Sequence, residues 1–222
     1  MQVAGGSKFL FPRWFNRAWL FVVLPAVAAA PVYGIGMLYY STSPKTMTVG
    51  YEPKQPVPYS HALHVGKLGL DCRYCHVGVE KTAYASIPAA ETCMACHKSI
   101  ATKRDSLQPV RSSFAGGDPI EWVRVHKVAD FAYFNHGAHV SRGVGCVECH
   151  GRIDKMETVS QVSDLTMGWC IDCHRNPEPH LRPKELVTVM DWKPTEDRTE
   201  LGQKLRKLYN LNPSTDCTTC HR

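Results

Sequence analysis

The sequence predicts a mainly α-helical chain with extensive irregular structure and one N-terminal transmembrane helix. Residues 18–40 form a run of 23 residues without a charged side chain. No long alternation of apolar and polar residues indicates a β-strand elsewhere in the chain. Five copies of a short cysteine- and histidine-containing motif punctuate the remainder. These motifs, rather than a hydrocarbon core, are therefore expected to organise the fold.

The uncharged run at residues 18–40 is long enough to cross a bilayer as a helix. The preceding segment, residues 1–17, carries Lys8, Arg13 and Arg17 and no acidic residue. Because positive charge stays on the cytoplasmic side, residues 1–17 are predicted to be cytoplasmic and the bulk of the chain to lie outside. Two prolines inside the run, at positions 25 and 31, are expected to bend the helix.

A cleaved signal peptide is the alternative for this N-terminal run. The small residues at positions 28–30 resemble a cleavage site, but Pro31 would follow the cut directly, which disfavours cleavage. Retention as a single-pass anchor is therefore predicted. Residues 41–58 contain four prolines and are expected to form an extended polar tether before the main domain, residues 59–222.

The repeated motif is Cys-x-x-Cys-His, the attachment signal of c-type haem, in which two thiols bond the porphyrin edge and the histidine reaches the iron. All ten cysteines of the chain lie in these five motifs. The cofactor-binding cysteines are Cys72, Cys75, Cys93, Cys96, Cys146, Cys149, Cys170, Cys173, Cys217 and Cys220. The motif histidines, as iron ligands, are His76, His97, His150, His174 and His221. Five covalently attached haems c are predicted.

Zinc is the main rival, because the intervals Cys75–Cys93 and Cys149–Cys170 enclose 17 and 20 residues, within the range of a four-cysteine zinc ribbon. Three features favour haem instead. A histidine follows every cysteine pair, the fifth motif has no partner pair, and the anchor places the thiols in an oxidising compartment. A disulfide framework would explain the cysteines but not the histidines.

Two segments of the main domain repeat one another, residues 59–99 and residues 126–182. Each holds an aromatic residue, a His-x-x-His pair and two of the five motifs, and the fifth motif, residues 217–221, follows outside both. The equivalent residues are Tyr59 and Phe134, His61 and His136, and His64 and His139. The interval from the second histidine to the first cysteine is one residue longer in the first copy. We therefore predict a duplicated two-haem module.

Six histidines outside the motifs are candidates for the sixth iron ligand. They are His61, His64, His126, His136, His139 and His180. Six candidates for five irons permit two histidine ligands at every iron. In a helix both members of a His-x-x-His pair lie on one face, so one is expected to serve the local haem and the other, such as His139, a neighbouring haem. A surface histidine remains the alternative for each, and Met167 or Met190 is an alternative axial ligand.

The net charge of +6 gives no support to nucleic-acid binding, since residues after position 44 hold 23 basic against 20 acidic side chains. The propionates of five haems would make this domain neutral to acidic. Paired carboxylates, phosphate loops and nucleophile triads do not stand out. If both axial positions of every iron are filled by the protein, the chain carries electrons without a substrate site of its own.

Three stretches, residues 122–159, 167–183 and 216–222, resemble the pentahaem cytochrome subunit of alternative complex III, a bacterial quinol-oxidising respiratory complex. The His-x-x-His pairs also resemble class III multihaem cytochromes more broadly. The resemblance implies a multihaem cytochrome c fold with a haem-organised core, anchored in the bacterial cytoplasmic membrane with the haem domain in the periplasm. It also implies that His61, His64, His126, His136 and His139 are distal ligands, with His180 as a further candidate.

The resemblance further implies partners. Quinol would be oxidised in a neighbouring multi-span membrane subunit, beside a subunit related to iron–sulfur molybdoenzymes. Electrons would leave to a monohaem cytochrome c or a terminal oxidase. The alternative function is a stand-alone, membrane-anchored multihaem quinol dehydrogenase, which would need an iron with an open or unusual ligand. A nitrite-reductase-like catalyst would also need an open iron.

Overall fold

The computed structural model describes residues 13–221, and residues 1–12 of the predicted cytoplasmic segment lie outside the described residues. The chain divides into two compact units, with the boundary between Met47 and Thr48. The first unit contains the apolar helix, and the second contains all five motifs.

The first unit is built from α1 (Arg13–Thr42) and α2 (Pro44–Met47). Helix α1 continues through Pro25 and Pro31 without interruption, and its segment Arg17–Thr42 is long and apolar enough to cross a membrane by length and composition. The prediction of an extended tether over residues 41–58 is wrong for its first part, because α1 ends at Thr42 and α2 covers Pro44–Met47. Pro44 occupies the first position of α2, where its missing N–H costs nothing and its fixed φ favours a helix.

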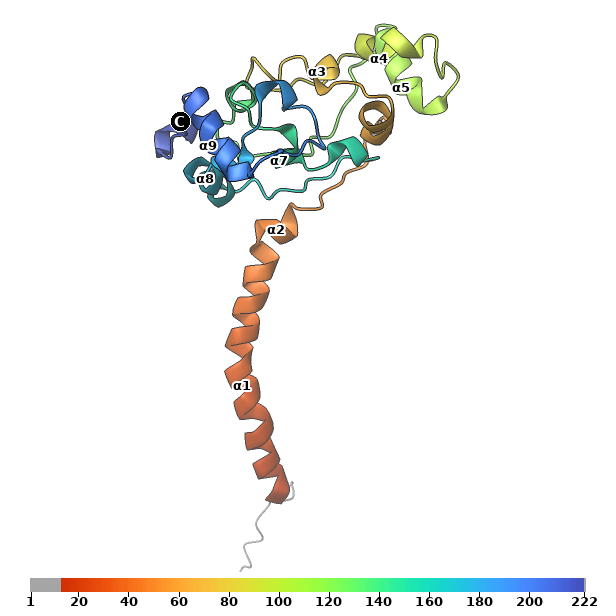
Figure 1. Ribbon diagram of the computed structural model, residues 1–222. Coiled ribbons are helices and arrows are strands. Elements are labelled where there is room, and N and C mark those ends of the chain that lie inside the picture. The colour runs from red at the N-terminus through yellow and green to blue at the C-terminus, as the bar shows by residue number, and fades with distance from the viewer. Residues whose placement is uncertain (1–12, 222) are drawn as a thin grey trace, which may run out of the picture. The chain divides into compact units, whose positions relative to one another are not determined.

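The second unit consists of short helices joined by long irregular segments (Figure 1). In chain order the helices of its first part are the π-helix η1 (Ala62–Lys67), α3 (Cys72–Cys75), α4 (Ala90–His97), the 3-10 helix η2 (Asp105–Leu107) and α5 (Gln108–Phe114). Those of its second part are α6 (His136–Val140), α7 (Cys146–His150), η3 (Ile153–Lys155), α8 (Met167–Arg175), η4 (Glu178–His180), η5 (Lys184–Leu186), α9 (Arg198–Leu208) and α10 (Cys217–Cys220). Within residues 13–221 the β-structure amounts to a single bridge, Val144–Leu181. The mainly helical, irregular fold is confirmed.

Several helices begin at a side chain that accepts a hydrogen bond from a free backbone N–H of the first turn. Asp71 caps α3, Asn135 caps α6, Thr166 caps α8 and Asp197 caps α9. Such caps stabilise a helix by about 0.5–2 kcal/mol each. Because these helices are too short to be stable alone, the caps on α3 and α8 help fix where the helices of the first and fourth motifs start.

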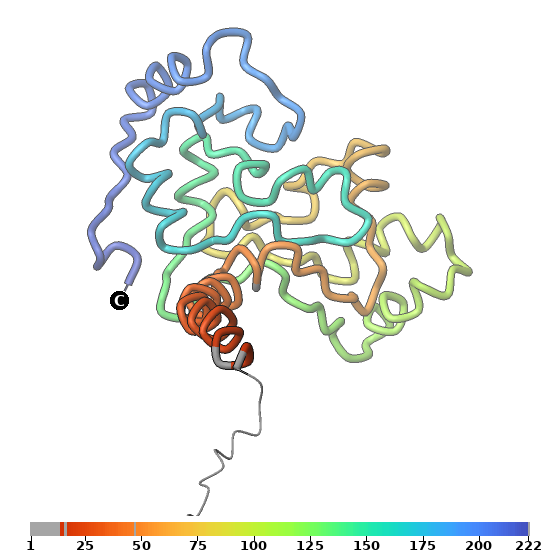
Figure 2. The backbone as a smooth tube through the Cα atoms, turned by 90° about the horizontal axis from the view of Figure 1, so that it is seen from below, coloured from red at the N-terminus to blue at the C-terminus, as the bar shows by residue number. Residues whose placement is uncertain are grey.

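Two small apolar clusters provide the hydrocarbon packing of the second unit. One joins Val57 to α4 and α5 through Ala90, Met94 and Val110. The other brings Val79, Val140 and Val187 together from three distant segments. Figures 1 and 2 show α4 and α5 at one end of this unit and α8 and α9 at the other.

Candidate haem-binding centre

Each Cys-x-x-Cys pair lies on one helical turn, in α3, α4, α7, α8 and α10. Residues three apart on a helix share a face, so the two thiols of each motif point to the same side. None of the ten cysteines forms a disulfide. Among residues 13–221, no group of three or more His, Cys, Asp or Glu side chains is placed to hold a bare metal ion.

The two predicted modules have the same ring geometry around their His-x-x-His pairs. Tyr59 lies 4.8 Å from the His61 ring at 85° and 4.4 Å from the His64 ring at 23°. Phe134 lies 4.8 Å from the His136 ring at 84° and 4.6 Å from the His139 ring at 29°. This correspondence supports the duplication in three dimensions.

The extra residue of the first module is absorbed by a change of helix type. The segment after His61 forms the π-helix η1, in which Leu68 N donates to Leu63 O, whereas the segment after Asn135 forms the α-helix α6. A π-turn accommodates one more residue than an α-turn. The insertion is therefore taken up locally, and the histidines keep equivalent positions.

Each His-x-x-His segment packs on the loop that follows the first motif of the other module. Ala62 N donates to Met156 O, and Gly137 N donates to Thr82 O, both at 2.9 Å. Met156 is six residues after His150, and Thr82 is six residues after His76, so the two bonds are equivalent. The modules thus interlock through a reciprocal pair of contacts.

The approach of these segments is close enough to require glycine. A Cβ on Gly66 would overlap the backbone carbonyl of Asp154, and one on Gly137 would lie 3.1 Å from Glu80 O. Small residues at these two contacts let the modules meet backbone to backbone.

Three candidate ligands face a motif histidine at a separation that fits one shared metal ion. Metal–nitrogen bonds to imidazole are about 2 Å long, so two imidazoles on opposite sides of one ion have ring centroids about 6 Å apart. The centroid distances are 6.2 Å for His64 and His97, 6.0 Å for His139 and His174, and 6.4 Å for His136 and His150. The first two pairs are equivalent in the two modules.

Most of the histidines are anchored through Nδ1, which leaves Nε2 for a metal. Nδ1 donates to a backbone carbonyl in His64, His76, His97, His136, His139, His174 and His221. Such a bond fixes the tautomer and the ring orientation of a metal-binding histidine. The residues present therefore fit covalently attached haem with histidine axial ligands.

A buried cluster of histidines lies where the modules meet. Burial is the main cause that lowers the pKa of His150 to about 3 and that of His61 to about 4, so both imidazoles are neutral at physiological pH. The ring of His126 lies 4.3 Å from that of His150, too close for the two to hold one metal ion from opposite sides. Three ring nitrogens in this cluster are buried without a protein partner: His61 Nδ1, His126 Nε2 and His150 Nδ1.

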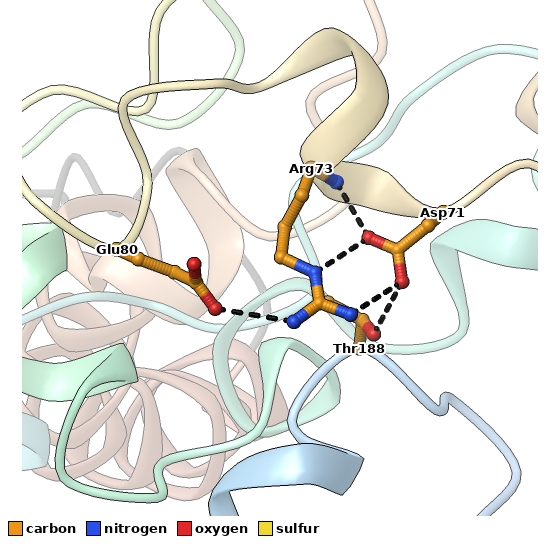
Figure 3. A network of polar contacts seen from close by, with 4 residues as sticks. All are labelled: Asp71, Arg73, Glu80 and Thr188. Carbon is orange, nitrogen blue, oxygen red and sulfur yellow. Dashed lines mark hydrogen bonds and ion pairs between the residues drawn. The ribbon is translucent and has the colours of Figure 1, made fainter.

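The first cysteines of the two modules also meet in this region. The thiols of Cys72 and Cys146 share a hydrogen bond, which lowers the pKa of the Cys146 thiol. Asp71, next to Cys72, binds Arg73 at 2.8 Å and accepts a 2.9 Å bond from Thr188, and Arg73 also reaches Glu80 (Figure 3). The start of the first motif is thus tied to the loop after η5.

His180 is held differently from the other candidates, because its Nδ1 lies 2.9 Å from Glu148 Oε2. Burial raises the pKa of Glu148, but the hydrogen bond with His180 and the charges of Arg198, His180 and Arg182 outweigh it and lower the pKa overall. Sequence reasoning missed Glu148 and Arg182. The one sequence feature that could have indicated this pair is the position of Glu148 inside a motif.

The two methionine candidates differ sharply in burial. Met167, at the first position of α8, is 68% exposed. Met190 is 7% exposed.

Comparison with known proteins agrees with this site. The family described as cytochrome c7 and related cytochrome c matches residues 132–222, which contain the fifth motif and the part of the second module that follows residue 131. Over 100 residues, the chain is 28% identical to the multiheme cytochrome c subunit of menaquinone reductase from Nitratidesulfovibrio vulgaris (strain Hildenborough). That alignment covers 45% of this chain and 47% of the relative, so the match spans about half of each. The chain is therefore similar to multihaem, cytochrome c7-like electron-transfer proteins, a class that carries covalently bound haem c.

Proposed function

We propose that this chain is the pentahaem electron-transfer subunit of a membrane complex of the alternative complex III type. It relays electrons from a quinol-oxidising membrane subunit to a periplasmic cytochrome c or a terminal oxidase. The observation that carries the proposal is the set of three histidine pairs with ring centroids 6.0–6.4 Å apart. Paired axial histidines favour one-electron transfer over bond chemistry, because they leave no coordination site for a substrate.

Haem c, when bound, supplies a one-electron Fe³⁺/Fe²⁺ couple whose potential depends on the axial ligands and their surroundings. The residues of this chain hold and orient that couple. We assign His64 with His97, His139 with His174, and His136 with His150 as axial pairs, supported by their ring distances. His61 is the candidate partner of His76, whose charge contributes, after burial, to the lowered pKa of His61. His126 and His180 remain for the iron of His221.

Anchoring by α1 completes the proposal. The apolar length of Arg17–Thr42 and the relationship to a subunit of menaquinone reductase support a membrane location. In this arrangement the first unit spans the cytoplasmic membrane and the second lies in the periplasm. A multi-span quinol-binding subunit and an iron–sulfur molybdoenzyme-like subunit are the proposed partners.

Purification of the native chain in mild detergent tests this function. Co-purification with a multi-span quinol-binding subunit, and haem reduction by added quinol only in that complex, are expected. Carbon monoxide should leave the reduced spectrum unchanged, because no iron is open. Recovery of the chain alone, with full quinol-oxidising activity, would replace this proposal with the stand-alone quinol dehydrogenase.

A second candidate follows from the name of the relative, which is a subunit of a menaquinone reductase. There the same relay would run in the opposite direction, from a periplasmic donor to the quinone pool. Stopped-flow mixing of the purified complex with quinol or with a reduced cytochrome separates the two. The faster haem reduction identifies the physiological donor.

A further inference from the structure

Glu148 and His180 come from different segments and meet beside the third motif. Glu148 lies on α7 between Cys146 and Cys149, and His180 ends η4. Their 2.9 Å contact joins residues 32 positions apart. Among the Nδ1 partners of the described histidines, Glu148 alone is a carboxylate, whereas the seven other anchored histidines bind backbone carbonyls.

The Glu148 carboxylate is held in place by two arginines. Its other oxygen accepts a 3.1 Å bond from Arg182 Nη2 and pairs with Arg198. Arg182 is 2% exposed, donates to Val189 O at 2.9 Å and lies over the Trp192 ring. Because the carboxylate is only 13% exposed and bonded through both oxygens, it presents a fixed acceptor to His180.

A fixed carboxylate on Nδ1 has two effects on an imidazole. The carboxylate only accepts, so Nδ1 carries the proton and Nε2 keeps its lone pair. The ring also becomes a stronger electron donor, as in the carboxylate–histidine–metal arrangements of other metalloproteins. Stronger donation, together with the nearby negative charge, favours Fe³⁺ over Fe²⁺.

We propose that Glu148 is a positioning residue that makes His180 an axial iron ligand and lowers the reduction potential of that haem. The inference rests on the proposed function only in requiring bound haem. It assigns His180 as the ligand with the most strongly donating imidazole among the histidines of the described chain.

The test is a spectroelectrochemical titration of the holo protein carrying Glu148→Gln. Losing such a partner changes metal binding by about 10- to 100-fold. The potential depends on the ratio of the affinities for Fe³⁺ and Fe²⁺, so a tenfold loss that falls on Fe³⁺ alone corresponds to about 59 mV for one electron. One haem should therefore rise in potential by up to about 60–120 mV while the others keep theirs. Asp172→Asn is the matched control. Asp172 is the third residue of the fourth motif, as Glu148 is of the third motif, and its side chain is exposed and forms no ion pair within residues 13–221. This control variant should shift no potential.

Two further variants keep the proposal falsifiable. Glu148→Asp retains the charge and should raise the same potential by less than Glu148→Gln does. His180→Ala should convert one low-spin EPR signal to high spin and let carbon monoxide bind the reduced protein. The proposal would be overturned if every haem potential were unchanged in Glu148→Gln. It would also be overturned if His180→Ala kept five low-spin haems and did not bind carbon monoxide when reduced. Either failure would leave quinol-dependent reduction of the complex intact and so be distinguishable from failure of the proposed function.

Discussion

Gly137 donates its backbone N–H to the carbonyl of Thr82 in the other module, and the bond from Ala62 to Met156 repeats this contact in reverse. The two copies are therefore in direct contact and do not simply follow one another along the chain. Each places its His-x-x-His segment against the loop after the first motif of the other copy. This reciprocity brings His61, His126 and His150 into one buried cluster where the modules meet.

Gly66→Ala should destabilise the protein through this interface. The new Cβ would overlap the backbone carbonyl of Asp154, which cannot rotate away as a side chain would. The cost of such overpacking is about 1–3 kcal/mol in the free energy of unfolding, measured by urea denaturation of the holo protein. Gly168→Ala is the control, since its Cβ would meet nothing closer than Thr166 Oγ1 at 4.0 Å. Equal stability of the two variants would contradict close packing at Gly66.

His64→Ala and His139→Ala should have matching effects, because the two residues have equivalent ring contacts and Nδ1 anchors. Each variant should keep all its haem, which is held by the thiols, but turn one low-spin haem high-spin in the EPR spectrum. Tyr59→Phe is the control, because Phe134 fills that place in the other module. If a variant kept its low-spin spectrum unchanged, the histidine replaced in that variant would not be an iron ligand.

Much of this arrangement could be predicted from local sequence. The aromatic residue and the histidine spacing identified the duplication. The rest depends on contacts between distant residues, which spacing does not encode. Glu148 and His180 are 32 residues apart, and Thr188 and Asp71 are 117 residues apart. The helix starting at Pro44 was missed because four prolines in 18 residues indicated an extended chain.

Acid should weaken the tie between Asp71, Arg73 and Thr188. The hydrogen bond from Arg73 is the largest cause that holds the pKa of Asp71 at about 2, below its ordinary value of 3.8. A depressed carboxyl pKa contributes stability that is full above about pH 4 and disappears as the pH falls through about 2. Because this pair is partly exposed, the contribution is below about 1 kcal/mol. Arg73→Gln should lower stability at pH 6 by that amount, by less at pH 2, where Asp71 is half protonated, and hardly at all at pH 1, in urea titrations at the three values. A difference at pH 1 as large as that at pH 6 would rule out this linkage.

Removing the two cysteines of the fifth motif should not affect the covalent attachment of the other four haems. Cys217 and Cys220 lie on α10, outside both modules. The double variant Cys217→Ala and Cys220→Ala should lose one haem in a pyridine haemochrome assay and retain the bis-histidine spectra of both modules. Loss of two or more haems would mean that the modules depend on the fifth motif for assembly.

The intact mass of the chain, produced with a c-type haem maturation system, tests the central claim most directly. The account predicts one species whose mass exceeds that of the polypeptide by five haems. A homogeneous product with four or fewer, with a complete motif left as free thiols, would contradict it.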